Sequence, residues 1–213
     1  KILAQHKVNI GGGDDIIISS VVPDVLMRIK KGLRGICKKK ILVVSENIDA
    51  PIKNLYAAPR QVGQDRLVNG VAAYKRVKGS VIVIDFGTAV TFDIISKSGA
   101  YMGGLIFPGI ELSLKSLAHN AALLPHIVLE APSSLIGKTT KESMKSGLVY
   151  GYGALCDGIV RQLKAKVGKD TKVLATGGHS FLIHKHCKEI DRVIPELTFE
   201  GLKHTYICRA KRN

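Results

Sequence analysis

Residues 81–95 constrain the fold of this chain more than any other stretch. Two runs of apolar, mostly β-branched residues flank a short turn that contains Asp85, Gly87, Thr88 and Thr91, which is the pattern of two strands. The glycine lets the backbone approach a ligand, and the N–H groups of a tight turn can cradle an anion. The hydroxyls can donate to phosphate oxygens, and the carboxylate can hold a cation. The pattern therefore fits either a phosphate site or an ordinary hairpin with a polar turn.

Composition limits the class of protein. The 213 residues are 46% hydrophobic and 5% aromatic, enough for one large or two small domains with aliphatic cores. No apolar run approaches the roughly 20 residues of a membrane span, and the four cysteines lack a Cys-x-x-Cys spacing. We therefore expect a cytoplasmic protein with reduced thiols and no membrane contact.

The net charge of +15 suits anionic ligands such as nucleotides. The basic residues are dispersed along the chain, and no motif that reads RNA or DNA accompanies them. A solvated basic surface explains the charge better than a nucleic-acid partner does, so no nucleic-acid partner is expected.

Hydrophobic patterning predicts the order of the elements. Strands are expected at residues 14–22, 40–44, 81–84, 90–95, 101–106, 172–176 and 191–194. Helices are expected at residues 24–35, with Asp24 as the cap, and then at 65–76, 109–120, 139–166, between 178 and 191, and from 199 onward. Residues 46–62 read as a loop. This order indicates an α/β fold with a mixed sheet, and a boundary near residues 77–80 divides the chain into 1–78 and 79–213.

Two short motifs are candidates for chemistry. Gly63-Gln64-Asp65-Arg66 lies where a loop enters a helix. Asp65 could simply cap that helix, or it could act as a general base for a substrate hydroxyl while Arg66 holds a carboxylate in a bidentate fork. Ala175-Thr176-Gly177-Gly178 follows a predicted strand and could lie against the adenosine of a nucleotide.

An ordered set of segments resembles the type III pantothenate kinases, which belong to the acetate and sugar kinase/Hsp70/actin superfamily. The set comprises Ser19–Pro23, Val62–Asn69, Ile84–Asp93, Tyr101–Gly104, Phe107–Ile110, Leu123–Pro125, Ile136–Thr140, Ser146-Gly147, Tyr150-Gly151 and Ala175–Gly178. The resemblance implies two ribonuclease H-like domains, the first being residues 1–78 and the second residues 79–213. It also implies phosphorylation of pantothenate by ATP, the first step toward coenzyme A.

The resemblance implies roles for particular residues. Asp65 would be the proton acceptor, and Asp85 would hold a monovalent cation, K⁺ or NH₄⁺. The residues implied at the pantothenate site are Gly63, Gln64, Asp65, Arg66, Thr140 and, closing over it, Tyr56. Those implied beside Mg²⁺-ATP are Gly87, Thr88 and Gly177. The family also works as a homodimer.

One departure from the family concerns the beginning of the chain. The family starts with a strand that ends in Asp-x-Gly-Asn-Thr, and this sequence starts at Lys1 without such a segment. We therefore expect the first domain to lack its N-terminal segment, and residues 1–213 alone to show little or no kinase activity. The alternative function is that of a Bvg accessory factor, a non-catalytic regulator of transcription from the same family. Retention of Asp65 and Arg66 favours the kinase.

Overall fold

A computed structural model describes residues 15–35 and 40–210, which form two sheets. A small parallel sheet contains β1 (Ile16–Ile18) and β2 (Ile41–Val43). The larger sheet has the strand order β3-β6-β5-β4-β7-β8. Its strands are β3 (Lys53–Asn54), β4 (Val81–Phe86), β5 (Ala89–Ile95), β6 (Ala100–Pro108), β7 (Lys172–Thr176) and β8 (Arg192–Val193).

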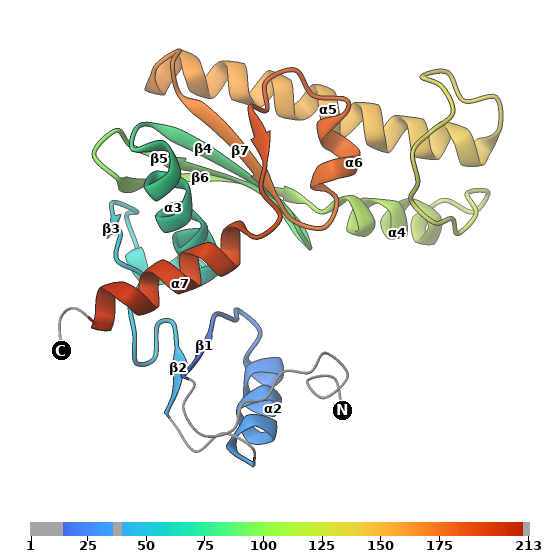
Figure 1. Ribbon diagram of the computed structural model, residues 1–213. Helices are drawn as coiled ribbons and strands as arrows, with labels where there is room; N and C mark the ends of the chain where they lie inside the picture. Colours follow the sequence, from blue (N-terminus) through green and yellow to red (C-terminus); the bar gives the residue numbers. More distant parts are fainter. Residues whose placement is uncertain (1–14, 36–39, 211–213) are drawn as a thin grey trace.

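Helices cover both faces of the larger sheet (Figure 1). One face carries α3 (Gln64–Val77) and α7 (Leu197–Ala210), and the other carries α4 (Ile110–Asn120), α5 (Thr140–Val167) and α6 (Ser180–His184). The remaining helices are α2 (Pro23–Arg34) and a 3-10 turn at Pro59–Gln61. None of the helices in the described part of the chain is both long and apolar enough to cross a membrane.

The predicted α/β class with a mixed sheet is confirmed. Strand β4 is antiparallel to β5 and parallel to β7, β5 is antiparallel to β6, and β7 is parallel to β8. Alternation along β4 sends Ile82, Ile84 and Phe86 into the core beneath α4, α5 and α6. Val81 and Val83 instead pack with residues of α3 and α7, so Asp85, two residues further on, shares the α3 face.

Several boundaries differ from the predictions. The strand expected at 14–22 is described only as Ile16–Ile18, which is half-buried, and Val21 and Val22 are exposed. Asp24 does not cap α2, because the helix already begins at Pro23 and no side chain caps it; its carboxylate lies in the first turn, where it favours the helix dipole. The loop at 46–62 contains β3 and the 3-10 turn.

Elements from both sides of residue 78 pack together. β3 pairs with β6, and α7 lies so close to α3 that a Cβ on Gly201 would overlap the backbone of Val68. Leu42 on β2 and Val44, which follows that strand, pack against residues of α3 and α7. The division into domains 1–78 and 79–213 stays a prediction.

Candidate active site

Acidic and hydroxyl side chains gather on the α3 face of the larger sheet. Asp85 on β4 lies directly opposite Thr91 on β5, and Val83 lies opposite Asp93. Because side chains alternate between faces, Asp85, Thr91 and Asp93 point to the same side. Helix α3 covers that side, so its first turn lies over the carboxylates.

Asp85 is a largely buried carboxylate with a firm partner. Its Oδ2 accepts a hydrogen bond of 3.0 Å from Asn69 Nδ2, and Asn69 Oδ1 accepts one of 2.7 Å from Thr198 on α7. The pKa of Asp85 is raised to about 6: burial is the main cause, the negative charges of Asp65 and Asp93 add to it, and the Asn69 hydrogen bond acts in the opposite direction. The structure therefore brings Asp65 within electrostatic reach of Asp85.

Asp65 lies in the first turn of α3 and is not its cap. The helix begins at Gln64 with Gly63 as the N-cap, and no side chain caps it. Asp65 Oδ1 instead accepts a hydrogen bond of 2.8 Å from the N–H of Arg66. A Cβ on Gly63 would lie 2.6 Å from that same Oδ1. A side chain at position 63 would therefore collide with the Asp65 carboxylate, and glycine avoids this collision. Because Gly63 is the N-cap, the prediction that Asp65 caps the helix is wrong.

The bend between β4 and β5 is open to solvent and bordered by glycines. Gly87 and Thr88 are exposed. Gly177 follows β7 with φ of 92°, and a Cβ there would lie 2.5 Å from Asp85 Oδ1. A Cβ on Gly109 would overlap the carbonyl of Thr88. Since β4 and β7 are parallel, their carboxyl ends meet at one edge of the sheet, and at this edge the backbones of Gly177 and Gly109 pack directly against the bend.

The Arg66 side chain is held against the larger sheet by an ion pair with Asp93 on β5. Its Nε donates to Asp93 Oδ1 at 2.7 Å, and Tyr101 donates its hydroxyl to the same oxygen at 2.8 Å. One edge of the guanidinium is thus already occupied, so Arg66 cannot offer Nε in the bidentate fork that the sequence suggested. Tyr56 lies nearby, because a Cβ on Gly103 would lie 3.7 Å from its ring.

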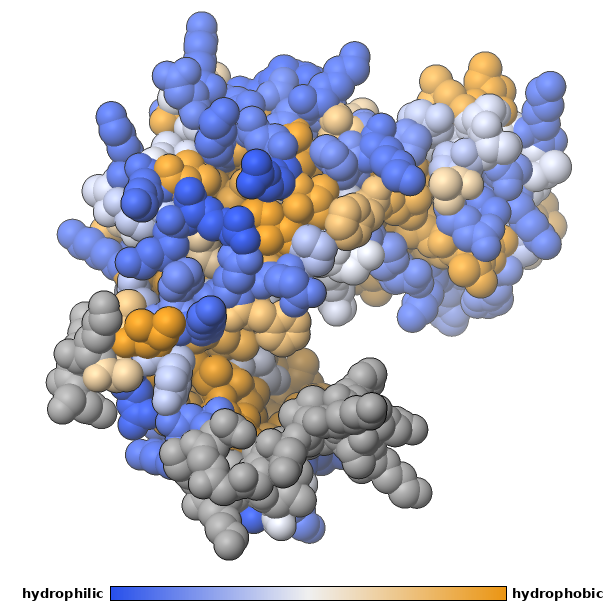
Figure 2. All heavy atoms as spheres, in the orientation of Figure 1, coloured by the Kyte–Doolittle hydropathy of each residue, from blue (hydrophilic) through white to orange (hydrophobic). Residues whose placement is uncertain are grey.

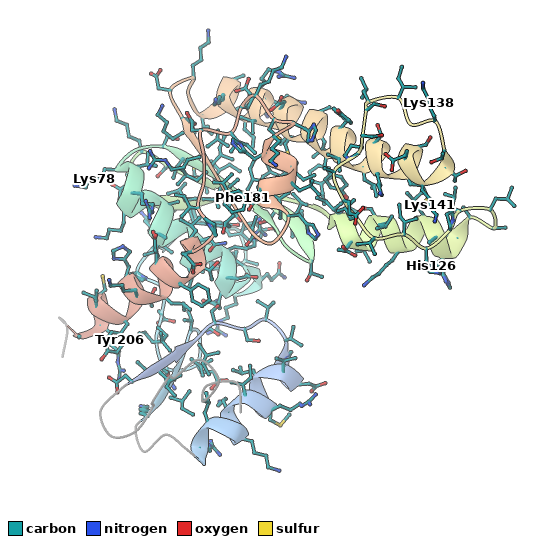
Figure 3. All side chains as sticks on the ribbon, turned by 45° about the vertical axis from the view of Figure 1, so that its right-hand side comes forward. Lys78, His126, Lys138, Lys141, Phe181 and Tyr206 are labelled. Atoms are coloured by element: carbon teal, nitrogen blue, oxygen red, sulfur yellow. The ribbon has the colours of Figure 1, made fainter. Side chains whose placement is uncertain are left out.

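Thr140 is not brought to this group of residues. It is the exposed first residue of α5, whose cap is the neighbouring Thr139 side chain. Helix α5 lies on the opposite face of the sheet from α3. Its start, bracketed by Lys138 and Lys141, lies at the far end of the molecule from α3 (Figures 1 and 3). Within one chain, Thr140 and Asp65 therefore cannot belong to the same site.

Sequence reasoning missed four residues of this site. Asn69 could have been found, because it follows Asp65 by one helical turn and so shares its face. Asp93 could also have been found from its alternation with Thr91. Tyr101 and Thr198 reach the site only through tertiary packing, which brings them to Asp93 and Asn69. No local sequence pattern indicates either contact.

The oxygen atoms at the bend are the ones available to a cation. No group of three or more His, Cys, Asp or Glu side chains able to hold a metal occurs within residues 15–35 and 40–210. Asp85 has one oxygen engaged by Asn69, and its Oδ1 faces the backbone at Gly177. Carboxylate, hydroxyl and backbone oxygens are ligands that hard cations accept, so the chemistry of these oxygens fits such a cation.

The mixed sheet with helices on both of its faces defines this protein as an α/β fold. Over the whole fold it resembles a Baf family transcriptional activator from Campylobacter jejuni, with a TM-score of 0.61, 20% identity and coverage of 97% of this chain and 89% of the other.

Sequence relatives then name the family. A sequence model described as type III pantothenate kinase matches residues 1–162. The chain is 41% identical to a type III pantothenate kinase of Myxococcus xanthus (strain DK1622), over 90% of this chain and 75% of that protein. It is 42% identical to one of Anaeromyxobacter sp. (strain K), over 88% of this chain and 74% of that protein. The chain belongs to the type III pantothenate kinase family.

Proposed function

We propose that the protein transfers the γ-phosphoryl group of ATP to the primary hydroxyl of pantothenate, forming 4'-phosphopantothenate for coenzyme A synthesis. Family membership over most of the chain supports the reaction. The observation that supports the site is the convergence of Asp65 and Asp85 on one sheet face, next to the open bend at Gly87-Thr88. Phosphoryl transfer needs mainly positioning and neutralised charge. This arrangement supports the positioning, and a cation held at Asp85 would supply the neutralisation.

Asp65 is the proposed proton acceptor. It is only half-buried, so a substrate hydroxyl can reach it, and its Oδ1 is steadied by the Arg66 N–H. As the hydroxyl oxygen attacks the γ-phosphorus, its proton passes to the Asp65 carboxylate, and the bond from that phosphorus to the bridging β-phosphate oxygen breaks, so that ADP leaves. The proposed pantothenate site therefore surrounds the start of α3, with Gly63, Gln64 and Arg66 lining it and Tyr56 beside it.

The bend after β4 is the proposed polyphosphate site. Thr88 would donate its hydroxyl to a phosphate oxygen, and Gly87 exposes its backbone there. Gly177 has no side chain, so its backbone can pack directly against Asp85. Asp85 would hold a cation, K⁺ or NH₄⁺, with Mg²⁺ accompanying ATP. A bound cation supplies neutralisation of the phosphate charge.

A homodimer would give Thr140 its proposed role. Because Thr140 begins α5, and the start of α5 lies at the far end of the molecule from α3, Thr140 can contact a pantothenate held at the start of α3 only if a second copy of the chain supplies it. Apolar side chains are exposed at the end of the molecule that carries the start of α5, among them Leu123, Leu135 and Ile136, and Figure 2 shows orange side chains gathered at that end. An exposed apolar patch is the common signature of a protein interface.

The test is a coupled assay of ADP release on the full-length gene product. We expect release that depends on pantothenate and rises when K⁺ or NH₄⁺ replaces Na⁺. Absence of pantothenate-dependent release, combined with DNA or RNA binding that weakens steeply with salt, would contradict the kinase and support the transcription-regulator alternative.

A further inference from the structure

Asp93 is a fully buried carboxylate with three side-chain donors. It accepts hydrogen bonds from Arg66 Nε at 2.7 Å, from the Tyr101 hydroxyl at 2.8 Å and from Thr91 Oγ1 at 2.9 Å. Burial raises the pKa of Asp93, while the Arg66 charge and the hydroxyl donors lower it. With every partner in place, the carboxylate and the guanidinium fix one another in a single geometry.

Arg66 uses only a portion of its guanidinium in this pair. Its Cζ lies 5.9 Å from the centre of the Tyr101 ring, and a Cβ on Gly104 would lie 2.6 Å from Nη2. Because Gly104 has no side chain, the guanidinium can pack directly against β6 at this position. Within the described residues, the buried Nη2 has no hydrogen-bond partner.

A buried N–H without an acceptor is unfavourable, and native structures rarely keep one. The acceptor that would satisfy Nη2 is an oxygen brought by a ligand. Arg66 directly follows Asp65 in the first turn of α3, so that ligand would be the substrate whose hydroxyl Asp65 deprotonates. A carboxylate is the acceptor that a guanidinium prefers.

We propose that Asp93 is a positioning residue for pantothenate: it holds Arg66 through Nε and thereby directs Nη2 to the substrate carboxylate. This inference rests on the proposed function. Asp93 itself touches no substrate and acts only through Arg66. Tyr101 and Thr91 contribute more indirectly, because their hydroxyls fix the carboxylate that fixes the guanidinium.

The test compares Asp93→Asn with wild type in the full-length protein, by calorimetric titration and steady-state kinetics. The ligands are pantothenate and its alcohol analogue, in which a hydroxymethyl group replaces the carboxylate. We expect the Kd and KM for pantothenate to rise about tenfold or more, with the KM for ATP near its wild-type value. The preference of wild type for pantothenate over the alcohol should disappear, which a general loss of stability would not cause.

Asp157→Asn is the matched control. Asp157 is also a buried carboxylate and accepts from two donors, the backbone N–H groups of Lys188 and Glu189. It lies on α5, across the sheet from α3. This variant should lose stability and keep both the affinity for pantothenate and the preference over the alcohol.

Two results would overturn the inference alone: wild-type affinity for pantothenate in Asp93→Asn, or an equal loss for both ligands. If wild type itself neither binds nor phosphorylates pantothenate, the proposed function fails and this inference fails with it. Should Asp93→Asn not fold, Tyr101→Phe and Thr91→Val each remove one donor to Asp93 and should weaken pantothenate binding about two- to fivefold. Unchanged affinity in both would refute the positioning role.

Discussion

At the scale of single residues, Asp65 has the most direct consequence for activity. We predict that Asp65→Asn lowers kcat at least about a hundredfold, because removing a general base costs that much or more. Glu200→Gln is the control, since Glu200 is likewise an acidic residue in the first turn of a helix and pairs with Arg76 in the last turn of α3, at the opposite end of that helix from Asp65. Turnover of Asp65→Asn close to wild type in the ADP-release assay would exclude Asp65 from the mechanism.

Asp85 links the site to stability. Its folded-state pKa of about 6 exceeds its ordinary value of 3.8, so between these pH values the folded state binds a proton that the unfolded chain does not. Stability from this group is therefore present at low pH and is lost as the pH rises through about 6. Above that pH, Asp85→Asn should stabilise the protein by about 1–3 kcal/mol, at about 1.4 kcal/mol per pKa unit.

Urea unfolding of wild type and Asp85→Asn checks this prediction. The stabilising difference should be present at pH 7.5 and vanish near pH 4, while the variant loses nucleotide-dependent activity. If wild type and Asp85→Asn had equal free energies of unfolding at pH 7.5, the buried charge of Asp85 would not destabilise the protein, and the prediction would be wrong. Substitutions at functional sites often raise stability while they abolish activity, because such sites retain groups that are unfavourable for folding.

At the scale of elements, the junction of β7 and α6 shows most clearly where the packing requires a glycine. Gly177 has φ of 92°, and a Cβ on it would meet Asp85 Oδ1 and the Phe86 backbone. Gly177→Ala should therefore cost about 1–3 kcal/mol of stability and raise the KM for ATP. The neighbouring Gly178 has open space around it, so Gly178→Ala should change both quantities little. Equal effects in the two variants would contradict the close packing inferred at Gly177.

At the scale of the whole molecule, the distance between Thr140 and Asp65 predicts shared sites in a dimer. Asp65→Asn and Thr140→Val should each be nearly inactive alone. After subunit exchange in an equal mixture, about one quarter of the sites should carry both intact residues, because half of the dimers are mixed and each has one complete site. Recovery of about a quarter of wild-type activity supports the arrangement, and a mixture that stays inactive contradicts it.

The secondary structure was largely predictable where local patterns are strong. The β-branched runs at 81–84 and 90–95 and the Pro108-Gly109 signal before α4 hold in the structure, since hydrophobic periodicity and helix-start signals are properties of neighbouring residues. Predictions failed where the pattern is short or mixed. β3 has only two residues and owes its place to β6, so nothing in its own sequence marks it as a strand.

The sequence by itself determined most of the elements, the family and the chemistry-bearing motifs at Asp65 and Asp85, because each of these is encoded in residues that are adjacent along the chain. Only the tertiary structure decided that Asp93 and Tyr101 hold Arg66, that Asn69 and Thr198 hold Asp85, and that Thr140 lies elsewhere. These contacts join residues that lie far apart in sequence, and strand register and helix packing alone fix which of them meet.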